Sequence, residues 1–151
     1  MTKRTTLALI AAALTVGTVA LTGCSNMGMN AYAQGGETQH VTLYAKNEVP
    51  PVAGNDAAVG DVTVKADGSV SGTVKVTGFT PTAAHIHMGA AGANGPVIVP
   101  MVKQGDDTFV FPPNAKMTPE QMTAYKAGNT YVNVHSAANP GGHVRAQLKG
   151  M

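Results

Sequence analysis

The chain has 151 residues, a single cysteine and a formal net charge of +2. A chain of this length is expected to bury one hydrophobic core, and a lone cysteine excludes an intrachain disulfide framework. Charged residues are only 12% of the sequence and form no basic patch, so we expect no nucleic-acid partner.

The amino-terminal residues 1–23 have the pattern of a secretory lipoprotein signal. Lys3 and Arg4 precede an apolar run, and Leu21-Thr22-Gly23-Cys24 is typical of a lipobox. We therefore predict that Cys24 is lipidated and becomes the first residue of the mature chain. A free thiol or an intermolecular disulfide at Cys24 is the alternative. Loss of the signal lowers the ten basic residues to eight, which equals the eight acidic ones.

This leader predicts a protein that is lipid-anchored on the periplasmic side of a bacterial membrane, at the outer membrane if the cell is diderm. The membrane is then a partner through the lipid on Cys24. Residues 24–38 carry no hydrophobic period and predict a flexible tether, whereas residues 39–151 predict the folded domain.

From His40 onward, apolar and polar residues alternate with the period of two that is typical of β-strands. Asp67-Gly68 predicts a tight turn between two of these strands. Glycine and proline punctuate the later runs. We expect strands within residues 41–46, 62–65, 70–76, 83–88, 97–103, 108–111, 130–135 and 143–149.

One helix is expected near residues 119–127. Thr118 is a good N-cap, Pro119 suits the first helical position, and Gln121 completes a capping box. The predicted fold class is therefore all-β, an antiparallel Greek-key sandwich or barrel of about seven to eight strands with one short helix.

Four histidines form two pairs. His85 and His87 are two residues apart on an expected strand and so lie on one face. His135 and His143 flank a turn that contains Pro140-Gly141-Gly142, and an antiparallel register would place them opposite each other. That register also pairs Asn133 with Arg145, Tyr131 with Gln147, Val134 with Val144, and Val132 with Ala146.

This register sorts polar residues to one face and apolar residues to the other, which is what fixes pairing in a half-buried sheet. Imidazole is the commonest metal ligand, so His85, His87, His135 and His143 predict a metal site if the two pairs meet in space. The alternative is a polar strand face that holds no metal. His40, beside the tether, and Met88, at the end of its strand, are weaker candidates for a further ligand.

The segment 84–97 (AHIHMGAAGANGPV) resembles the core of the CHRD (chordin-type) domain. The segments 43–52 (LYAKNEVPPV), 131–136 (YVNVHS) and 140–148 (PGGHVRAQL) are similar to its opening and closing parts. The resemblance covers residues 40–149. It implies an all-β domain outside the cytoplasm, without assigning a biochemical activity.

One position departs from this family, which commonly has glutamate where the present chain has His143. With imidazole in place of a carboxylate ligand, the site would contain only nitrogen, which favours copper, or zinc as the alternative, over calcium or magnesium. His85, His87 and His135 also resemble the histidine arrangement of copper-zinc superoxide dismutases. The usual disulfide cysteines and an obvious zinc loop are missing, so this resemblance implies a copper-only enzyme.

The leading functional hypothesis is a copper protein that dismutates superoxide, with Arg145 as a fixed cation that steers the superoxide anion to the metal. Arg145 in a surface ion pair or hydrogen bond is the alternative. A non-catalytic copper or zinc buffer or carrier is a second hypothesis, and a metal-free surface interaction module is a third. Hydrolase chemistry is not expected, because the sequence has no Gly-x-Ser-x-Gly elbow and no glycine-rich phosphate loop.

Overall fold

The computed structural model describes residues 35–150. The predicted signal, the lipidation site Cys24 and the first part of the predicted tether lie outside the described residues. Strand β1 begins at Glu37, so the last residues of that predicted tether already belong to the fold. Within the described residues, no helix combines the length and the apolar character that crossing a membrane requires.

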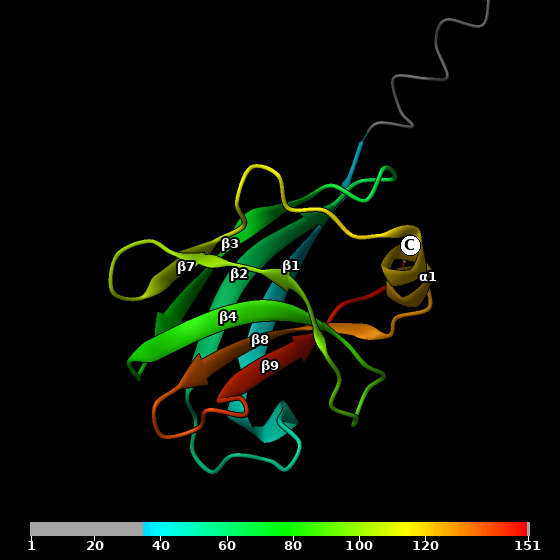
Figure 1. Cartoon of the computed structure of the whole chain (residues 1–151). Helices are drawn as coiled ribbons and strands as arrows, with labels where there is room; N and C mark the ends of the chain where they lie inside the picture. Colours follow the sequence, from blue (N-terminus) through cyan, green and yellow to red (C-terminus); the bar gives the residue numbers. More distant parts are fainter. Residues whose placement is uncertain (1–34, 151) are drawn as a thin grey trace, which may run out of the picture.

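The regular secondary structure of the described chain is strand, apart from one α-helix and one short 3-10 turn (Figure 1). The helix α1 spans Pro119–Lys126, and a single 3-10 turn, η2, spans Ala45–Asn47. The strands are β1 (Glu37–Tyr44), β2 (Ala57–Val64), β3 (Val70–Thr77), β4 (Pro81–Met88), β5 (Val97–Pro100), β6 (Val102–Lys103), β7 (Thr108–Val110), β8 (Thr130–Ser136) and β9 (Val144–Gln147).

All strands belong to one antiparallel sheet in the order β5-β4-β8-β9-β1-β2-β3-β7-β6. The two ends of this order, β5 and β6, are separated in the chain only by Met101, whose N–H donates to the carbonyl of Ala84 in β4. The chain itself therefore connects the two edges of the sheet, which curls into a nearly closed barrel (Figure 1). The predicted all-β fold with one short helix is confirmed, and the expected strand 97–103 is divided in two at Met101.

The interior of the barrel is filled by the apolar residues of the alternating pattern. Leu43, Val74, Ile86 and Val132 are completely buried. Met122 and Tyr125 of α1 join the same core. Burial of such side chains contributes roughly 1.5–3 kcal/mol each relative to exposure, so this inner layer supplies most of the driving force for folding.

Local signals set the connections between these elements. Val64 pairs with Val70 around the Asp67-Gly68 turn, where Gly68 has a φ of 87° that other residues rarely adopt. The Thr118 hydroxyl accepts the N–H of Gln121, and the Gln121 side chain accepts the N–H of Thr118. The predicted hairpin and capping box are both confirmed.

The outer face of β4, β8 and β9 is covered, although it faces away from the barrel interior. Three loops, residues 45–56, 89–96 and 137–143, lie below β8 and β9 and on either side of them in Figure 1. Beneath them Asn133 and Arg145 are 2% and 3% exposed. The loops therefore create a second buried layer, and this layer is polar.

Candidate metal centre

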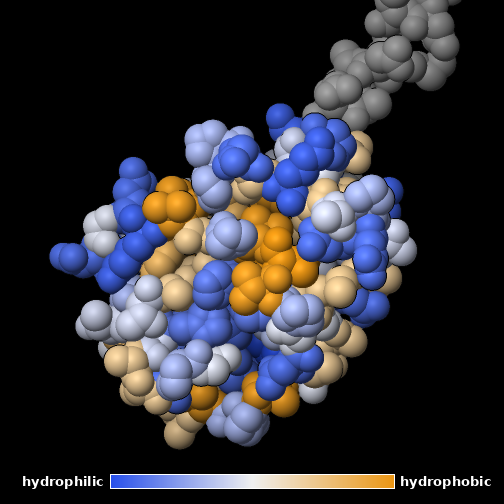
Figure 2. Space-filling view, in the orientation of Figure 1, coloured by the Kyte–Doolittle hydropathy of each residue, from blue (hydrophilic) through white to orange (hydrophobic). Residues whose placement is uncertain are grey.

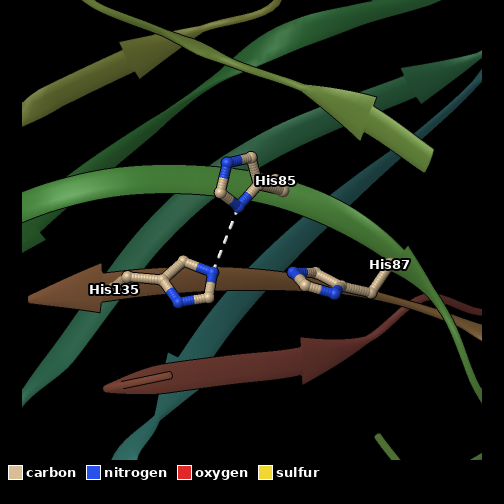
Figure 3. A group of neighbouring side chains, drawn as sticks. All are labelled: His85, His87 and His135. Carbon is tan, nitrogen blue, oxygen red and sulfur yellow. Dashed lines mark hydrogen bonds between the residues drawn. The ribbon is translucent and has the colours of Figure 1, made fainter. Parts of the chain in front are cut away.

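The three histidines His85, His87 and His135 meet on the outer face of β4 and β8. His85 and His87 lie on the same side of β4, and His135 lies on the neighbouring strand β8. Each offers a nitrogen, and these atoms all lie within 4.8 Å of one another. Figure 3 shows the three rings in front of the two strands with nitrogen atoms turned toward a common point. This spacing suits a single metal ion.

Backbone carbonyl groups fix two of the three rings. Nδ1 of His87 lies 2.9 Å from the carbonyl oxygen of Gly95, and Nδ1 of His135 lies 3.0 Å from that of Pro140. A carbonyl oxygen only accepts, so each Nδ1 must carry a proton and donate. The Nε2 atoms of His87 and His135 are therefore the nitrogens that keep a free lone pair.

His85 completes the group in a different way. Its Nδ1 lies 3.1 Å from Nε2 of His135, the contact drawn as a dashed line in Figure 3. Without a metal, one of these nitrogens must donate to the other. With a metal, both would present lone pairs to it. His85 is also the only partly exposed ring of the three, since His87 and His135 are buried, at 7% and 8% exposed.

The surroundings keep these rings neutral. Burial lowers the pKa of His85 to about 4, with a further contribution from the neighbouring rings of His135 and His87. Burial likewise lowers the pKa of His135, and it lowers the pKa of His87 despite the opposing hydrogen bond to Gly95. A neutral imidazole is the form that binds metal, so at neutral pH the group is ready to coordinate.

On one side of the centre, His85 lies next to β5, which is at one end of the sheet order. His85 pairs across the strands with Pro100 of β5. Figure 2 shows an apolar area in the middle of this face, where β5 passes, bordered by hydrophilic surface over β8 and β9. Val97 of β5 is 48% exposed. His85 is therefore the most accessible of the three rings.

His143 does not join the other three histidines, which corrects the four-histidine expectation. Its Nε2 lies 2.9 Å from Oδ2 of Asp56, and its Nδ1 lies 2.7 Å from Oγ of Ser136. Its ring stacks on Phe79 at 3.7 Å between centroids. The predicted register of β8 and β9 is confirmed for all four pairs from Tyr131–Gln147 to Val134–Val144. His143, however, precedes the first residue of β9, so strand alternation no longer fixes its direction.

The hydrogen-bonded residues Asp56, His143 and Ser136 are of the types found in a hydrolytic triad, but their contacts serve to hold a turn in place. Ser136 is 4% exposed, and its Oγ accepts the N–H of Asn139 while it contacts His143. A nucleophile needs an accessible oxygen. These contacts instead hold the loop 137–143, whose Pro140 carbonyl orients His135.

Arg145 lies on the same face as the centre, as predicted from the register, and it is buried. Its Nε donates to the carbonyl oxygen of Asn47 at 2.7 Å. Its Nη1 donates to the carbonyl of Ala93 and to the side chain of Asn94. The guanidinium also lies over the Tyr131 ring, 4.5 Å from its centroid. Arg145 thus connects two covering loops rather than projecting into solvent.

The two weaker candidates stay apart from the centre. The side chain of His40 is 87% exposed and contacts Asp61 on the outer face of β1 and β2. Met88 follows His87 in β4, so strand alternation directs it to the other side. Neither His40 nor another histidine, cysteine or acidic residue of the described chain joins the three rings.

Three further residues belong to the same covered polar layer as the centre, and no functional role was predicted for them from the sequence. Tyr131 stacks against His87 with ring centroids 5.0 Å apart. Asn133 donates through Nδ2 to both carboxylate oxygens of Glu48, at 3.0 and 3.2 Å. Burial raises the pKa of Glu48, against lowering contributions from Arg145 and Asn133. The alternation already placed Tyr131 and Asn133 on the histidine face, but no pattern marked Glu48, which comes from a loop.

Comparison with known families decides the classification. The family model of the CHRD domain matches residues 40–148. The chain belongs to the CHRD domain family. No curated protein and no solved structure gave a match. The resemblance seen in the sequence is thus confirmed for the CHRD domain, which covers every strand except the first three residues of β1 and contains all three clustered histidines.

Proposed function

We propose that this CHRD domain binds a copper ion through Nδ1 of His85 and Nε2 of His87 and His135. The observation that carries the proposal is the convergence of three neutral imidazoles, two of them fixed by backbone carbonyls. Nε2 of His87 supports it further, because this atom is buried and has no hydrogen-bond partner among the described residues. A buried acceptor without a partner costs about 1–3 kcal/mol, and a metal ion at this point would remove that cost.

The donor set favours copper. Three imidazole nitrogens suit copper and zinc, and copper(II) binds more tightly than zinc at a given nitrogen site. Calcium and magnesium need oxygen ligands. The nearby carboxylates have other partners, since Asp56 contacts His143 and Glu48 contacts Asn133. Zinc is therefore the alternative ion, and it would support no redox chemistry.

The reaction that we propose for the copper form is dismutation of superoxide. Three protein ligands leave a coordination position open, which is typical of catalytic rather than structural sites. A copper ion held by His85, His87 and His135 would supply one-electron redox chemistry, by which one superoxide would be oxidised to dioxygen and a second would be reduced, with two protons, to hydrogen peroxide. We propose that both superoxides approach beside His85, which is the partly exposed ring of the three.

This proposal gives Arg145 no steering role. A steering cation must present its charge to the solvent, whereas Arg145 is 3% exposed and its Nε and Nη1 groups already donate to loop oxygens. The lipid anchor at Cys24 and the periplasmic location remain part of the proposal. Replacement of Cys24 by Ser should move the protein from the membrane fraction to the soluble fraction.

Copper titration of the purified protein tests the proposal. We expect uptake of one ion per chain, with nitrogen hyperfine structure in the EPR spectrum of copper(II). His135→Ala should abolish tight binding, whereas His40→Ala, which removes an exposed histidine of the same domain, should leave it unchanged. No tight uptake by the unaltered protein would refute the proposal and favour a metal-free interaction module.

A superoxide assay on the copper form then distinguishes an enzyme from a non-catalytic copper buffer or carrier. Rapid dismutation that is lost in His135→Ala would support the enzyme. Tight copper binding without dismutation would leave a copper buffer or carrier. Elemental analysis after reconstitution with both copper and zinc measures which ion the protein retains. Preferential retention of zinc would refute the redox function.

A further inference from the structure

Arg145 touches the two supports that hold His87, although it does not touch His87 by any described hydrogen bond. The first support is the Tyr131 ring, which lies nearly parallel to His87 with 9° between the ring planes. The Arg145 guanidinium lies over that same Tyr131 ring. The second support is the loop 89–96, which provides the carbonyl of Gly95.

The loop contacts are concentrated in three consecutive residues. Gly95 donates its N–H to the Tyr131 hydroxyl at 3.1 Å and accepts from Nδ1 of His87 through its carbonyl. The two residues before it, Ala93 and Asn94, both accept from Nη1 of Arg145. Arg145 therefore fixes the backbone immediately before the carbonyl that orients His87.

The choice of arginine has a physical reason. Its planar guanidinium donates in several fixed directions and stacks on an aromatic ring at the same time. Here those directions reach Asn47 in one covering loop and Ala93 in another, while the plane lies over Tyr131. Lysine has the same charge but only a compact ammonium group, so it could not make all of these contacts together.

We propose that Arg145 is a positioning residue that fixes the tautomer and direction of His87, so that Nε2 of His87 is the atom offered to the metal. This inference rests on the proposed function for the identity of the metal. Its geometry concerns the metal-free protein as well, because the carbonyl of Gly95 can select the protonated Nδ1 only while the loop is held. Partners of this kind determine which imidazole nitrogen binds a metal.

The test compares Arg145→Lys with the unaltered protein in two measurements. Long-range nitrogen–proton NMR on the metal-free protein reports the tautomer of each histidine. We expect His87 to change from a single Nδ1–H tautomer to a mixture, while His135, held by the separate loop at Pro140, stays unchanged as an internal control. Copper titration should show an affinity lowered by about 10- to 100-fold, the usual cost of losing an outer-shell partner of a metal ligand.

Two milder variants cover the case in which Arg145→Lys does not fold. Tyr131→Phe removes only the hydroxyl that holds the N–H of Gly95 and keeps the ring, and Asn94→Ala removes one acceptor of Arg145. Both should shift the His87 tautomer in the same direction by a smaller amount. Lys75→Gln, which changes a cation that is 63% exposed on another part of the barrel, should change neither measurement.

The results separate this inference from the proposed function. An unaltered protein that binds no copper would refute the proposed function, and the tautomer measurement would still decide the role of Arg145. An unchanged His87 tautomer in all the folded variants would overturn the positioning role. A lower dismutation rate with unchanged copper affinity and a reduced salt dependence in Arg145→Gln, which removes the positive charge, would indicate steering instead.

Discussion

The two halves of the outer barrel surface follow the same strand alternation but differ in how far their outward side chains are exposed to solvent. On β1, β2 and β3 the outward side chains lie in solvent, as shown by His40 at 87% and Val59 at 54% exposed. On β4, β8 and β9 most outward side chains beneath the loops are buried, as shown by His87 at 7% and Asn133 at 2%, although His85 is partly exposed. The difference comes from the three loops that cover only the second half.

The covering loops change the hydrogen-bond partners that are available to a polar residue. An exposed histidine exchanges hydrogen bonds with water, whereas a buried one must find partners in the protein, and those partners fix its tautomer. In the covered half these partners are carbonyls of the covering loops themselves, at Gly95 and Pro140. The chemistry of this domain is therefore concentrated where loops turn an outer face into an interior.

The largest expected effect tests whether the inner core and the covered polar layer are energetically separate. Ile86 is fully buried in the core and stands between His85 and His87 in β4. Ile86→Ala should lower the free energy of unfolding by about 2–5 kcal/mol, through lost burial and the cavity left behind. Urea denaturation measures this loss.

The matched control for Ile86 is Val59→Ala on the exposed half, which should stay within about 0.5 kcal/mol of the unaltered protein. The copper stoichiometry of folded Ile86→Ala should remain that of the unaltered protein. A loss of stability at Val59 as large as that at Ile86 would contradict the division into a core and an open outer face.

A smaller effect is expected from the polar layer itself. Asn133→Ala removes both hydrogen bonds to the buried carboxylate of Glu48, and an unsatisfied buried group costs about 1–3 kcal/mol. Because burial raises the pKa of Glu48, this cost should shrink in acid, where Glu48 takes up a proton. Unfolding curves of Asn133→Ala at two pH values test this, with Thr73→Ala on the exposed half as the control. A cost independent of pH would indicate lost packing instead.

The pH dependence of stability should also separate the two halves. Burial lowers the pKa values of His85, His87 and His135 in the folded state, so below pH 6.5 the unfolded chain binds more protons at these sites. The metal-free protein should therefore lose stability as the pH falls from 6.5 toward the folded pKa of His85, which is about 4. Glu48, with its raised pKa, acts in the opposite direction in the acid part of this range.

Unfolding free energies measured across this pH range for the metal-free protein and for His85→Asn test the assignment. The slope should be shallower in the variant, since one of the three contributing rings is gone. A slope that does not change would mean that other groups determine the acid sensitivity.

The smallest effect is expected at His40. His40→Ala removes the exposed contact with Asp61, and exposed pairs contribute little to stability because water screens them. Copper affinity, dismutation rate and unfolding midpoint should therefore all stay close to those of the unaltered protein. A marked loss of copper affinity in this variant would place a ligand on the open half of the barrel.

Most of the strand pattern could be predicted because alternation is local. The pairing of β8 with β9 followed from sorting polar and apolar residues to opposite faces, and its four pairs agree with the structure. The helix cap at Thr118 followed from a motif of four residues. His85 and His87 could be placed together because they share one strand, but their meeting with His135 required the β4–β8 pairing, which joins segments about 50 residues apart in the chain.

The direction of the His143 side chain could not be predicted from the local sequence pattern. The alternation that describes β9 starts at Val144, and one residue earlier the chain is still in the turn, so a stacking partner and Asp56 decided its direction. Glu48 and the carbonyls of Gly95 and Pro140 gave no signal in the sequence. Loop carbonyls are common to all residues, and only their position in space gives them a role.

The class of fold, the register of the last hairpin and the face on which each strand residue lies could all be predicted from the residues alone, because they depend on neighbours along the chain and on hydrophobic alternation. The burial of one outward face, the meeting of three histidines and the nitrogen that each of them offers became visible only in the folded molecule. These properties depend on loops that pack across the barrel, and contacts between distant segments have no local pattern in the sequence.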